Sequence, residues 1–257
     1  RLVFSLFSRD DRALNSIDEW FRSYNDKVDI NKVQNTLQKI SYSECIFVLG
    51  LNDFIFKQNV EKGYEQIKIA QKIIEHLPGQ QHFKSNIYGQ LAQYYVDIGD
   101  LKNAEESLQK MLLLKTKYPE IELSPRLYYL VNSKIYLNNG QYEFALKEIE
   151  YCLGIEENKI ILNNTFLYGT YLLQARILNR MKNYNKAKEI CLKIYKQSTF
   201  TKLDSDLIAL TYIELSTAEL GLNSINNDAF NYAEQAYKLL KNNKIRNNDI
   251  LHSRDTY

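Results

Sequence analysis

The stretch Y-V-D-I-G-D-L-K-N-A-E-E-S-L, residues 95–108, has the pattern of a helix end, a glycine turn and the start of a second helix. It returns as Y-L-N-N-G-Q-Y-E-F-A-L-K-E-I at residues 136–149 and as L-N-R-M-K-N-Y-N-K-A-K-E-I-C at residues 178–191. The three phrases share a small residue that recurs at intervals of 41 or 42 residues along the chain: Gly63, Ala104, Ala145, Ala187 and Ala229. This regular period predicts an array of internal repeats.

Other columns around the small residue predict a helical hairpin in each repeat. A turn precedes it at Gly99-Asp100, Gly140-Gln141 and Lys182-Asn183, where Gly or Asn supplies the left-handed conformation that ends a helix. An aromatic residue stands sixteen residues before it, or seventeen in the last repeat: Phe47, Tyr88, Tyr129, Tyr171 and Tyr212. Apolar residues follow the small residue four and seven positions later, which makes one stripe along the second helix. They are Ile67 and Ala70, Leu108 and Met111, Ile149 and Cys152, Cys191 and Ile194, and Ala233 and Ala236. A hairpin of this kind leaves one apolar face open and must stack on its neighbour.

These residues resemble the tetratricopeptide repeat. The family pattern has an aromatic residue early in the first helix, a Leu beside a small residue, a Tyr, a Gly turn, and an Ala on the second helix. The second repeat matches it best: Tyr88, Leu91, Ala92, Tyr95, Gly99, Ala104, Leu108 and a late Pro119. The resemblance covers roughly residues 44–242. It implies an all-α fold, a right-handed α-solenoid of stacked antiparallel helical hairpins.

The period is longer than the family's usual ~34 residues. The extra residues predict helices longer by about one turn of ~3.6 residues, or longer loops between repeats. Lengthened repeats are similar to those of bacterial regulators, including peptide-pheromone receptors, large ATP-dependent activators and sensory arrays fused to kinases.

We expect a single array over residues 1–257. The register predicts repeats at about residues 30–80, 81–120, 121–160, 161–202 and 203–245. Residues 1–29 are predicted to supply part of a preceding hairpin, because Ala13, Ile17 and Trp20 have the spacing of a second helix. Residues 246–257 are predicted to begin a further helix or a tail. Since the chain starts at Arg1 without Met, we expect a fragment or a processed form.

Composition and motifs argue against several classes of function. The 33 Lys and Arg nearly balance the 31 Asp and Glu, so no global charge favours nucleic acid or anionic lipid. The longest apolar run, residues 45–51, is far shorter than the roughly 20 residues of a membrane helix. No signal peptide is visible, and we expect a cytoplasmic protein.

Candidate catalytic and metal-binding residues are isolated from one another. His76, His82 and His252 have no partner at metal-ligand spacing, and the first two flank a predicted surface loop. The three cysteines fall at apolar helix positions and are predicted to be core residues without a redox role: Cys45, Cys152 and Cys191. No glycine-rich phosphate motif is present. We expect no cofactor, no metal and no catalysis by this region.

The resemblance implies that the first helix of each hairpin lines a concave surface, where family members hold extended peptides or partner helices. In the repeat register, the position five residues after the early aromatic and the position four residues later should face this groove. They give the predicted site: Asn52, Gln93, Asp97, Lys134, Asn138, Arg176 and Arg180, with Phe56 and Thr217 at equivalent places. Amide and guanidinium groups there could bind a peptide backbone or its carboxylate. Asn52 is the amide type of the family's carboxylate-binding members, but Val48 stands where they have a lysine.

We therefore expect a non-catalytic protein- or peptide-binding module, the ligand-sensing or scaffold part of a larger bacterial regulatory protein. Two alternatives stay open: a sensory or accessory array of a signalling enzyme such as a histidine kinase, and a structural scaffold that uses its convex faces. The expected partner is a protein or peptide, without direct nucleic-acid binding or membrane insertion. Self-association also stays open.

Overall fold

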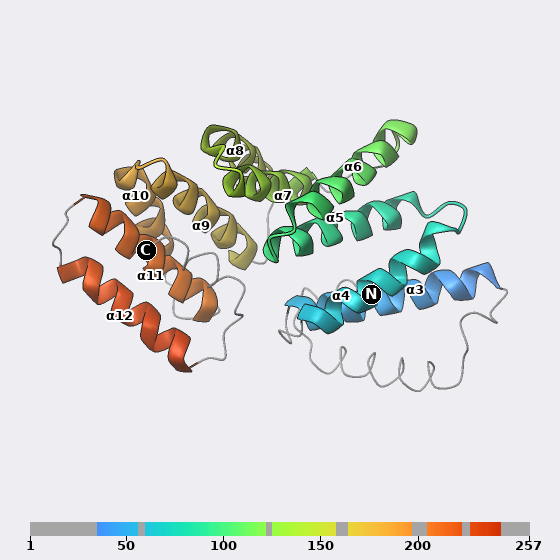
Figure 1. Ribbon diagram of the computed structural model, residues 1–257, viewed down its shortest axis with the longest axis horizontal. Helices are drawn as coiled ribbons and strands as arrows, with labels where there is room; N and C mark the ends of the chain where they lie inside the picture. Colours follow the sequence, from blue (N-terminus) through green and yellow to red (C-terminus); the bar gives the residue numbers. More distant parts are fainter. Residues whose placement is uncertain are drawn as a thin grey trace. The chain divides into compact units, whose positions relative to one another are not determined.

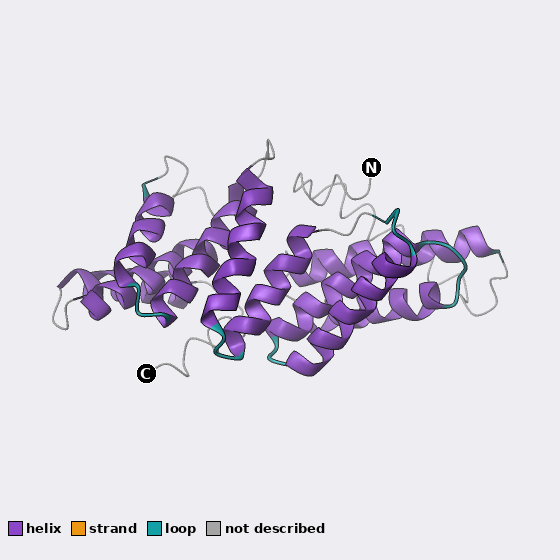
Figure 2. Cartoon of the chain, turned by 90° about the horizontal axis from the view of Figure 1, so that it is seen from above, coloured by secondary structure: helices purple, strands orange, loops and turns teal. Residues whose placement is uncertain are grey.

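The computed structural model describes residues 35–55, 60–121, 125–157, 164–196, 205–222 and 227–242. This described part of the chain contains helices and loops and no strand (Figure 2). The chain divides into two compact units, one ending at Ser124 and the other beginning at Pro125. None of the described helices is both long enough and apolar enough to cross a membrane. The predicted segments 1–29 and 246–257 and Phe56 lie outside the described residues.

The N-terminal unit contains two described hairpins (Figure 1). The first hairpin is α3 (Thr36–Ile55) and α4 (Val60–Glu75), and the second is α5 (Gln81–Asp97) and α6 (Leu101–Lys117). The helices of each hairpin pack on one another, and α4 also packs on α5. We call the first helix of a hairpin its A helix and the second its B helix.

The C-terminal unit contains three described hairpins (Figure 1). They are α7 (Pro125–Asn138) with α8 (Tyr142–Glu157), α9 (Asn164–Arg180) with α10 (Tyr184–Tyr195), and α11 (Ser205–Leu222) with α12 (Asn227–Asn242). Each B helix before the last packs on the following A helix, so α8 packs on α9 and α10 on α11. The A helices α9 and α11 also touch one another. The predicted all-α fold of stacked antiparallel hairpins is confirmed.

The column of small residues lies where the two helices of each hairpin meet. Ala104, Ala145 and Ala187 are fully buried, and Gly63 and Ala229 are buried as well. In the first hairpin a Cβ atom added to Gly50 would lie 2.9 Å from the Gly63 carbonyl oxygen, so α3 and α4 approach closely at these glycines. A larger side chain in this column has no space to occupy.

A serine on the A helix binds the backbone at this contact in two repeats. The Ser133 hydroxyl donates to the Ala145 carbonyl oxygen at 2.8 Å, and the Ser216 hydroxyl donates to the Ala229 carbonyl oxygen at 2.8 Å. Both hydroxyls are buried, so the bond removes the penalty of burying them unpaired. This hydrogen bond recurs two repeats apart, so the register extends to hydrogen bonding.

The apolar stripe of the B helices is buried as predicted in all but one place. The residues four and seven positions after the small residue are buried in the first four hairpins and at Ala236 in the fifth. The prediction was wrong at Ala233, which is exposed, because no described helix stacks on that side of α12.

The three described turns inside hairpins share one hydrogen-bond pattern. Gly99, Gly140 and Lys182 have positive φ angles of 82°, 71° and 60°. At each turn the next residue's N–H donates to the carbonyl five residues earlier, at 2.8 Å in every case. This is the Schellman ending of a helix, in which a left-handed residue satisfies otherwise unpaired carbonyls. The prediction of a Gly or Asn at this place was wrong in the fourth repeat: Lys182 takes the left-handed conformation, and Asn183 has a φ of −89°.

Replacing Lys182 by Gly is expected to raise the free energy of unfolding by about 0.5–1 kcal/mol. A non-glycine residue in the left-handed region carries a steric penalty of roughly 1–2 kcal/mol, of which glycine's greater freedom in the unfolded chain cancels part. Urea denaturation followed by circular dichroism measures the change. Lys182→Ala is the control, since it removes the same side chain but keeps a Cβ atom, and it should stay within about 0.5 kcal/mol of wild type. Equal stability of the two variants would contradict the account of this turn.

Tyrosines of α4 and α5 pack on one another where the first two hairpins meet. Tyr64 of α4 stacks on Tyr94 of α5 with ring centroids 4.2 Å apart, and its hydroxyl lies 3.0 Å from that of Tyr95. Burial, with the hydrogen bond to Tyr95 as a second cause, raises the pKa of Tyr64 to about 12. Stacked and edge-on aromatic pairs add stability beyond the area that they bury. These rings therefore contribute to the contact between hairpins.

Candidate functional site

The predicted site residues fall on A helices in both units. Asn52 lies on α3, but its side chain is not among those described. Gln93 and Asp97 lie on α5 in the N-terminal unit and are half-buried. In the C-terminal unit, Lys134 and Arg176 are half-buried, whereas Asn138 and Arg180 are exposed. The described site residues therefore form one polar pair in the N-terminal unit and two in the C-terminal unit.

The spacing of these pairs follows from helix geometry. Members of a pair are four residues apart and so share one face of their helix. On α7 the apolar residues Val131 and Ile135 are buried, with exposed fractions of 0% and 3%. Lys134 is half-buried, and Asn138 is exposed at the C-terminal end of the helix. With Val131 and Ile135 they have i, i+3, i+4, i+7 spacing, so this polar pair lies beside the packing residues on one side of α7.

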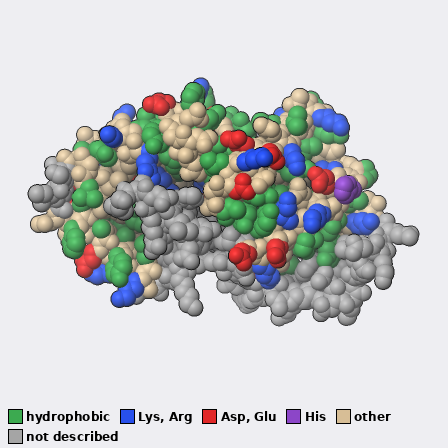
Figure 3. Space-filling model, viewed as in Figure 1, with side chains coloured by type: hydrophobic (Ala, Val, Ile, Leu, Met, Phe, Trp, Pro, Cys, Tyr) green, Lys and Arg blue, Asp and Glu red, His purple; other side chains and the backbone are tan. Residues whose placement is uncertain are grey.

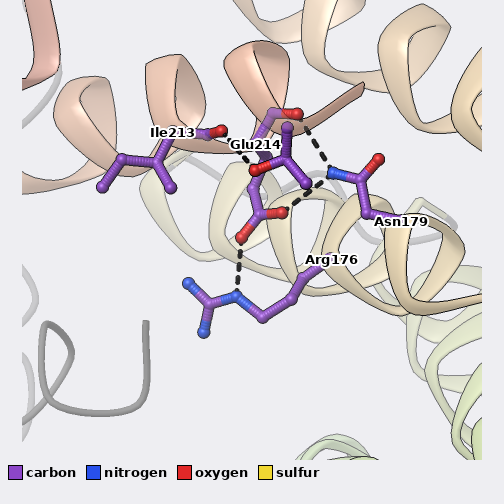
Figure 4. Close-up of polar contacts among 5 residues, drawn as sticks. Arg176, Asn179, Ile213 and Glu214 are labelled. Atoms are coloured by element: carbon purple, nitrogen blue, oxygen red, sulfur yellow. Dashed lines mark hydrogen bonds and ion pairs between the residues drawn. The ribbon is translucent and has the colours of Figure 1, made fainter. Parts of the chain in front are cut away.

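Arg176 is held by a polar network between two A helices (Figure 4). Its Nε atom donates to Glu214 Oε1 at 2.8 Å, which links α9 to α11. The Asn179 side-chain amide donates to Glu214 Oε2 and to the Glu214 carbonyl oxygen, both at 3.0 Å. Glu214 is only 5% exposed, and a buried carboxylate needs such partners. The network makes Arg176 a structural residue, whatever else it binds.

The Thr217 hydroxyl, at the equivalent place in the fifth repeat, is used within its own helix. It donates to the Ile213 carbonyl oxygen at 2.9 Å. This hydrogen bond to the preceding turn is common for a threonine inside a helix. The fifth repeat therefore differs from the third and fourth, which carry Lys134 and Arg176 at this place.

Two further buried carboxylates bind lysines of neighbouring helices. Asp53 of α3 pairs with Lys62 of α4 at 2.9 Å, and Glu219 of α11 pairs with Lys188 of α10 at 2.6 Å. Asp53, Glu214 and Glu219 were not predicted from the sequence. The signal was present, because each acidic residue interrupts an apolar helix that otherwise reads as core. Its partner could not be identified, since it lies on another helix.

The histidines and cysteines lie where the sequence predicts. His76 and His82 are exposed near the loop between α4 and α5, and His252 lies outside the described residues. All three cysteines are buried. Burial raises the pKa of the Cys191 thiol, and the nearby Glu214 carboxylate raises it further. A buried neutral thiol is a poor nucleophile, so the predicted core role of Cys191 is confirmed.

Charges of both signs are distributed over the described surface. On the face drawn in Figure 3, basic and acidic side chains are interspersed with hydrophobic ones. Within the described residues, no group of three or more His, Cys, Asp or Glu has a geometry that could hold a metal ion. The polar pairs on the A helices thus remain the strongest candidate for binding among the predicted features.

The described helices have a tetratricopeptide-like fold, as solved structures show. The chain is similar to BtubC (BKLC) from P. vanneervenii, with 14% identity and a TM-score of 0.61, over 89% of this chain and 90% of that chain. It is also similar to a putative kinesin light chain with TPR-like repeats from Podosopora anserina, with 16% identity and a TM-score of 0.54, over 78% and 95% of the two chains.

A third similar structure belongs to a much longer protein. This is a signal transduction ATPase with numerous domains and a tetratricopeptide repeat sensor from Pyrococcus horikoshii. Identity is 21% and the TM-score 0.59, over 78% of this chain, which spans only 30% of that protein. No protein-family model matches the chain, and no curated protein is similar to it. At these identities the likeness shows the fold.

Proposed function

We propose that this chain is a non-catalytic module that binds an extended peptide or a segment of a partner protein on its A helices. The observation that carries the proposal is that three A helices each carry two polar side chains, four residues apart, that are half-buried or exposed. Buried apolar residues such as Val131 and Ile135 lie beside them. A face of amides and cations at helical spacing suits hydrogen bonding to a peptide that lies across successive helices.

The charges of the C-terminal unit suggest a partner segment that carries carboxylates. Two cationic side chains reach the surface of this unit: Lys134 on α7 is half-buried, and Arg180 on α9 is exposed. The charge of Arg176 is compensated by Glu214. The exposed amide of Asn138 adds a neutral donor and acceptor. Charge-assisted hydrogen bonds to carboxylates are stronger than neutral ones, which favours an acidic segment.

The module is further proposed to be the sensor of a larger regulatory protein. The similar ATPase from Pyrococcus horikoshii carries a tetratricopeptide repeat sensor, and this chain spans only part of it. In an array where each hairpin touches its neighbours, small rotations between hairpins accumulate along the chain. A ligand that binds one arrangement better than another would shift the population and pass a signal to an attached domain.

The probe for this proposal is a peptide selected from a random display library, with the whole chain as bait. The tightest peptide is titrated by calorimetry into wild type and into a double variant, Lys134→Ala with Arg180→Ala. We expect the double variant to bind about tenfold more weakly, or roughly 1.4 kcal/mol less favourably, because two charge-assisted contacts are lost.

A double variant on B helices is the matched control. Lys147 of α8 and Lys186 of α10 are exposed, and replacing both by Ala removes the same charge. Its affinity should stay within about twofold of wild type. Equal affinity of the two double variants would reject the A helices of the C-terminal unit as the binding face. Circular dichroism confirms that each variant is folded.

A further inference from the structure

Two glycines inside helices are explained by close packing. A Cβ atom added to Gly50 of α3 would lie 2.9 Å from the Gly63 carbonyl oxygen, and a Cβ atom added to Gly221 of α11 would overlap the Tyr184 ring. A larger residue at either position would force the neighbouring helix or ring to move, because these contacts are already filled. Packing therefore accounts for glycine at these two places.

Gly169, inside α9, has no such explanation. Apart from its chain neighbours and the backbone of its own helix, no heavy atom of the described residues would lie within 4 Å of a Cβ atom added there. Its φ angle is not positive, so the backbone does not require glycine either. Glycine makes a helix interior less stable than alanine does, since it loses more conformational freedom on folding. The packing of the described residues thus gives no reason for glycine at this position.

Gly169 lies on the same line of α9 as two residues of the proposed binding site. Arg176 and Arg180 follow it by seven and eleven residues, and at ~3.6 residues per turn both lie within about 20° of it around the helix axis. Gly169 is half-buried, and Arg180 is exposed. Leu172 and Leu173, one turn beyond Gly169, are buried apolar residues. The line therefore runs from a glycine with apolar neighbours to two cations.

We propose that the open space beside Gly169 takes a bulky apolar side chain of the partner segment, while Arg180 binds an acidic group of the same segment. This inference rests on the proposed function, and it narrows the partner to a segment that carries both kinds of side chain. Because Gly169 has no Cβ atom, the partner's side chain can approach the backbone of α9. The apolar neighbours favour a side chain without charge, since burying an unpaired charge there would be costly.

A series of larger residues at Gly169 tests the proposal by calorimetry with the display-selected peptide. We expect Gly169→Ala to weaken binding about threefold and Gly169→Leu to weaken it about tenfold or more, because the added carbon atoms fill the space that the partner's side chain needs. Gly154→Ala and Gly154→Leu are the matched controls. Gly154 is an exposed glycine of the B helix α8, and an added Cβ atom likewise has no described neighbour within 4 Å. Both controls should bind within about twofold of wild type.

Alanine replacements along the peptide identify the side chain that occupies the space. One bulky apolar residue of the peptide should lose about tenfold in affinity for wild type when it is replaced by Ala. The same replacement should change the affinity for Gly169→Leu by less than about twofold, because its side chain has no space in that variant. A peptide that has no such apolar residue, or whose losses are equal in wild type and Gly169→Leu, would overturn the proposal.

Melting temperatures separate an effect on binding from an effect on packing. Gly169→Ala should melt at or above the temperature of wild type, as should Gly154→Ala, because alanine favours a helix. A lower melting temperature of Gly169→Ala would show that packing requires the glycine, which overturns the proposal.

The double variant of Lys134 and Arg180 separates this inference from the proposed function. If that variant loses affinity and the Gly169 variants do not, the space beside Gly169 is rejected and the binding face stands. If neither loses affinity, or if the library yields no peptide, both are rejected.

Discussion

Arg176→Ala is expected to lower the free energy of unfolding by about 3 kcal/mol, because it leaves the buried Glu214 carboxylate without its cation. Asn179 would still donate to that carboxylate, but a neutral amide does not balance a buried charge. A loss of this size is a large fraction of the stability of a typical domain. Urea denaturation with the linear extrapolation to water measures it.

Two variants separate the network from a general effect of charge. Arg180→Ala removes the same charge one turn away at an exposed position and should cost less than about 0.5 kcal/mol. Arg176→Met combined with Glu214→Leu removes both partners and should lie within about 1.5 kcal/mol of wild type, since replacing a buried pair by apolar residues is often neutral. If Arg176→Ala costs no more than Arg180→Ala, the network does not stabilise the contact between α9 and α11.

This role of Arg176 affects how binding experiments are designed. A variant at Arg176 would change both the predicted binding face and the packing of α9 on α11. A loss of affinity in that variant could then come from either cause. Lys134 and Arg180 are better choices, because neither belongs to the network around Glu214.

Ala145→Trp is expected to unfold or loosen the third hairpin and to lower the free energy of unfolding by more than about 3 kcal/mol. Ala145 is fully buried where α7 meets α8, and its carbonyl oxygen accepts the Ser133 hydroxyl. Overpacking a filled core typically costs about 1–3 kcal/mol for added methylene groups, and an indole ring is much larger. The melting temperature and the urea midpoint both measure the effect.

The neighbouring residue provides the control for this substitution. Phe144 is 58% exposed on the same helix, so Phe144→Trp adds bulk into solvent and should leave the melting temperature within about 2 °C of wild type. If Ala145→Trp melts at the temperature of Phe144→Trp, the small-residue column is not the contact between the helices.

The sequence predicted the hairpins because their determinants are local. Gly99 lies in the turn between two helices, and Ala104 lies near the start of the second one. The spacing between these two positions repeats along the chain. A period read from one chain therefore predicts which residues end a helix and which are buried. The turn at Lys182 was predicted less well, since the surrounding helices impose a left-handed conformation on a residue that does not prefer it.

The candidate site was predicted less completely because it depends on contacts between repeats. Periodicity predicts that Arg176 occupies a groove position of an A helix, but it cannot show that Glu214, 38 residues later, binds it. The same limit applies to Glu219, whose partner Lys188 lies on the preceding B helix. Contacts of this kind depend on the rotation between neighbouring hairpins, which no local pattern encodes.

The central claim, that a partner binds the A helices, is tested most directly by hydrogen exchange of the whole chain with and without the display-selected peptide. We expect slower exchange in α7 and α9 when the peptide is bound, with exchange in α8 and α10 unchanged. Protection confined to α8 and α10, or equal protection of both sets of helices, would contradict it.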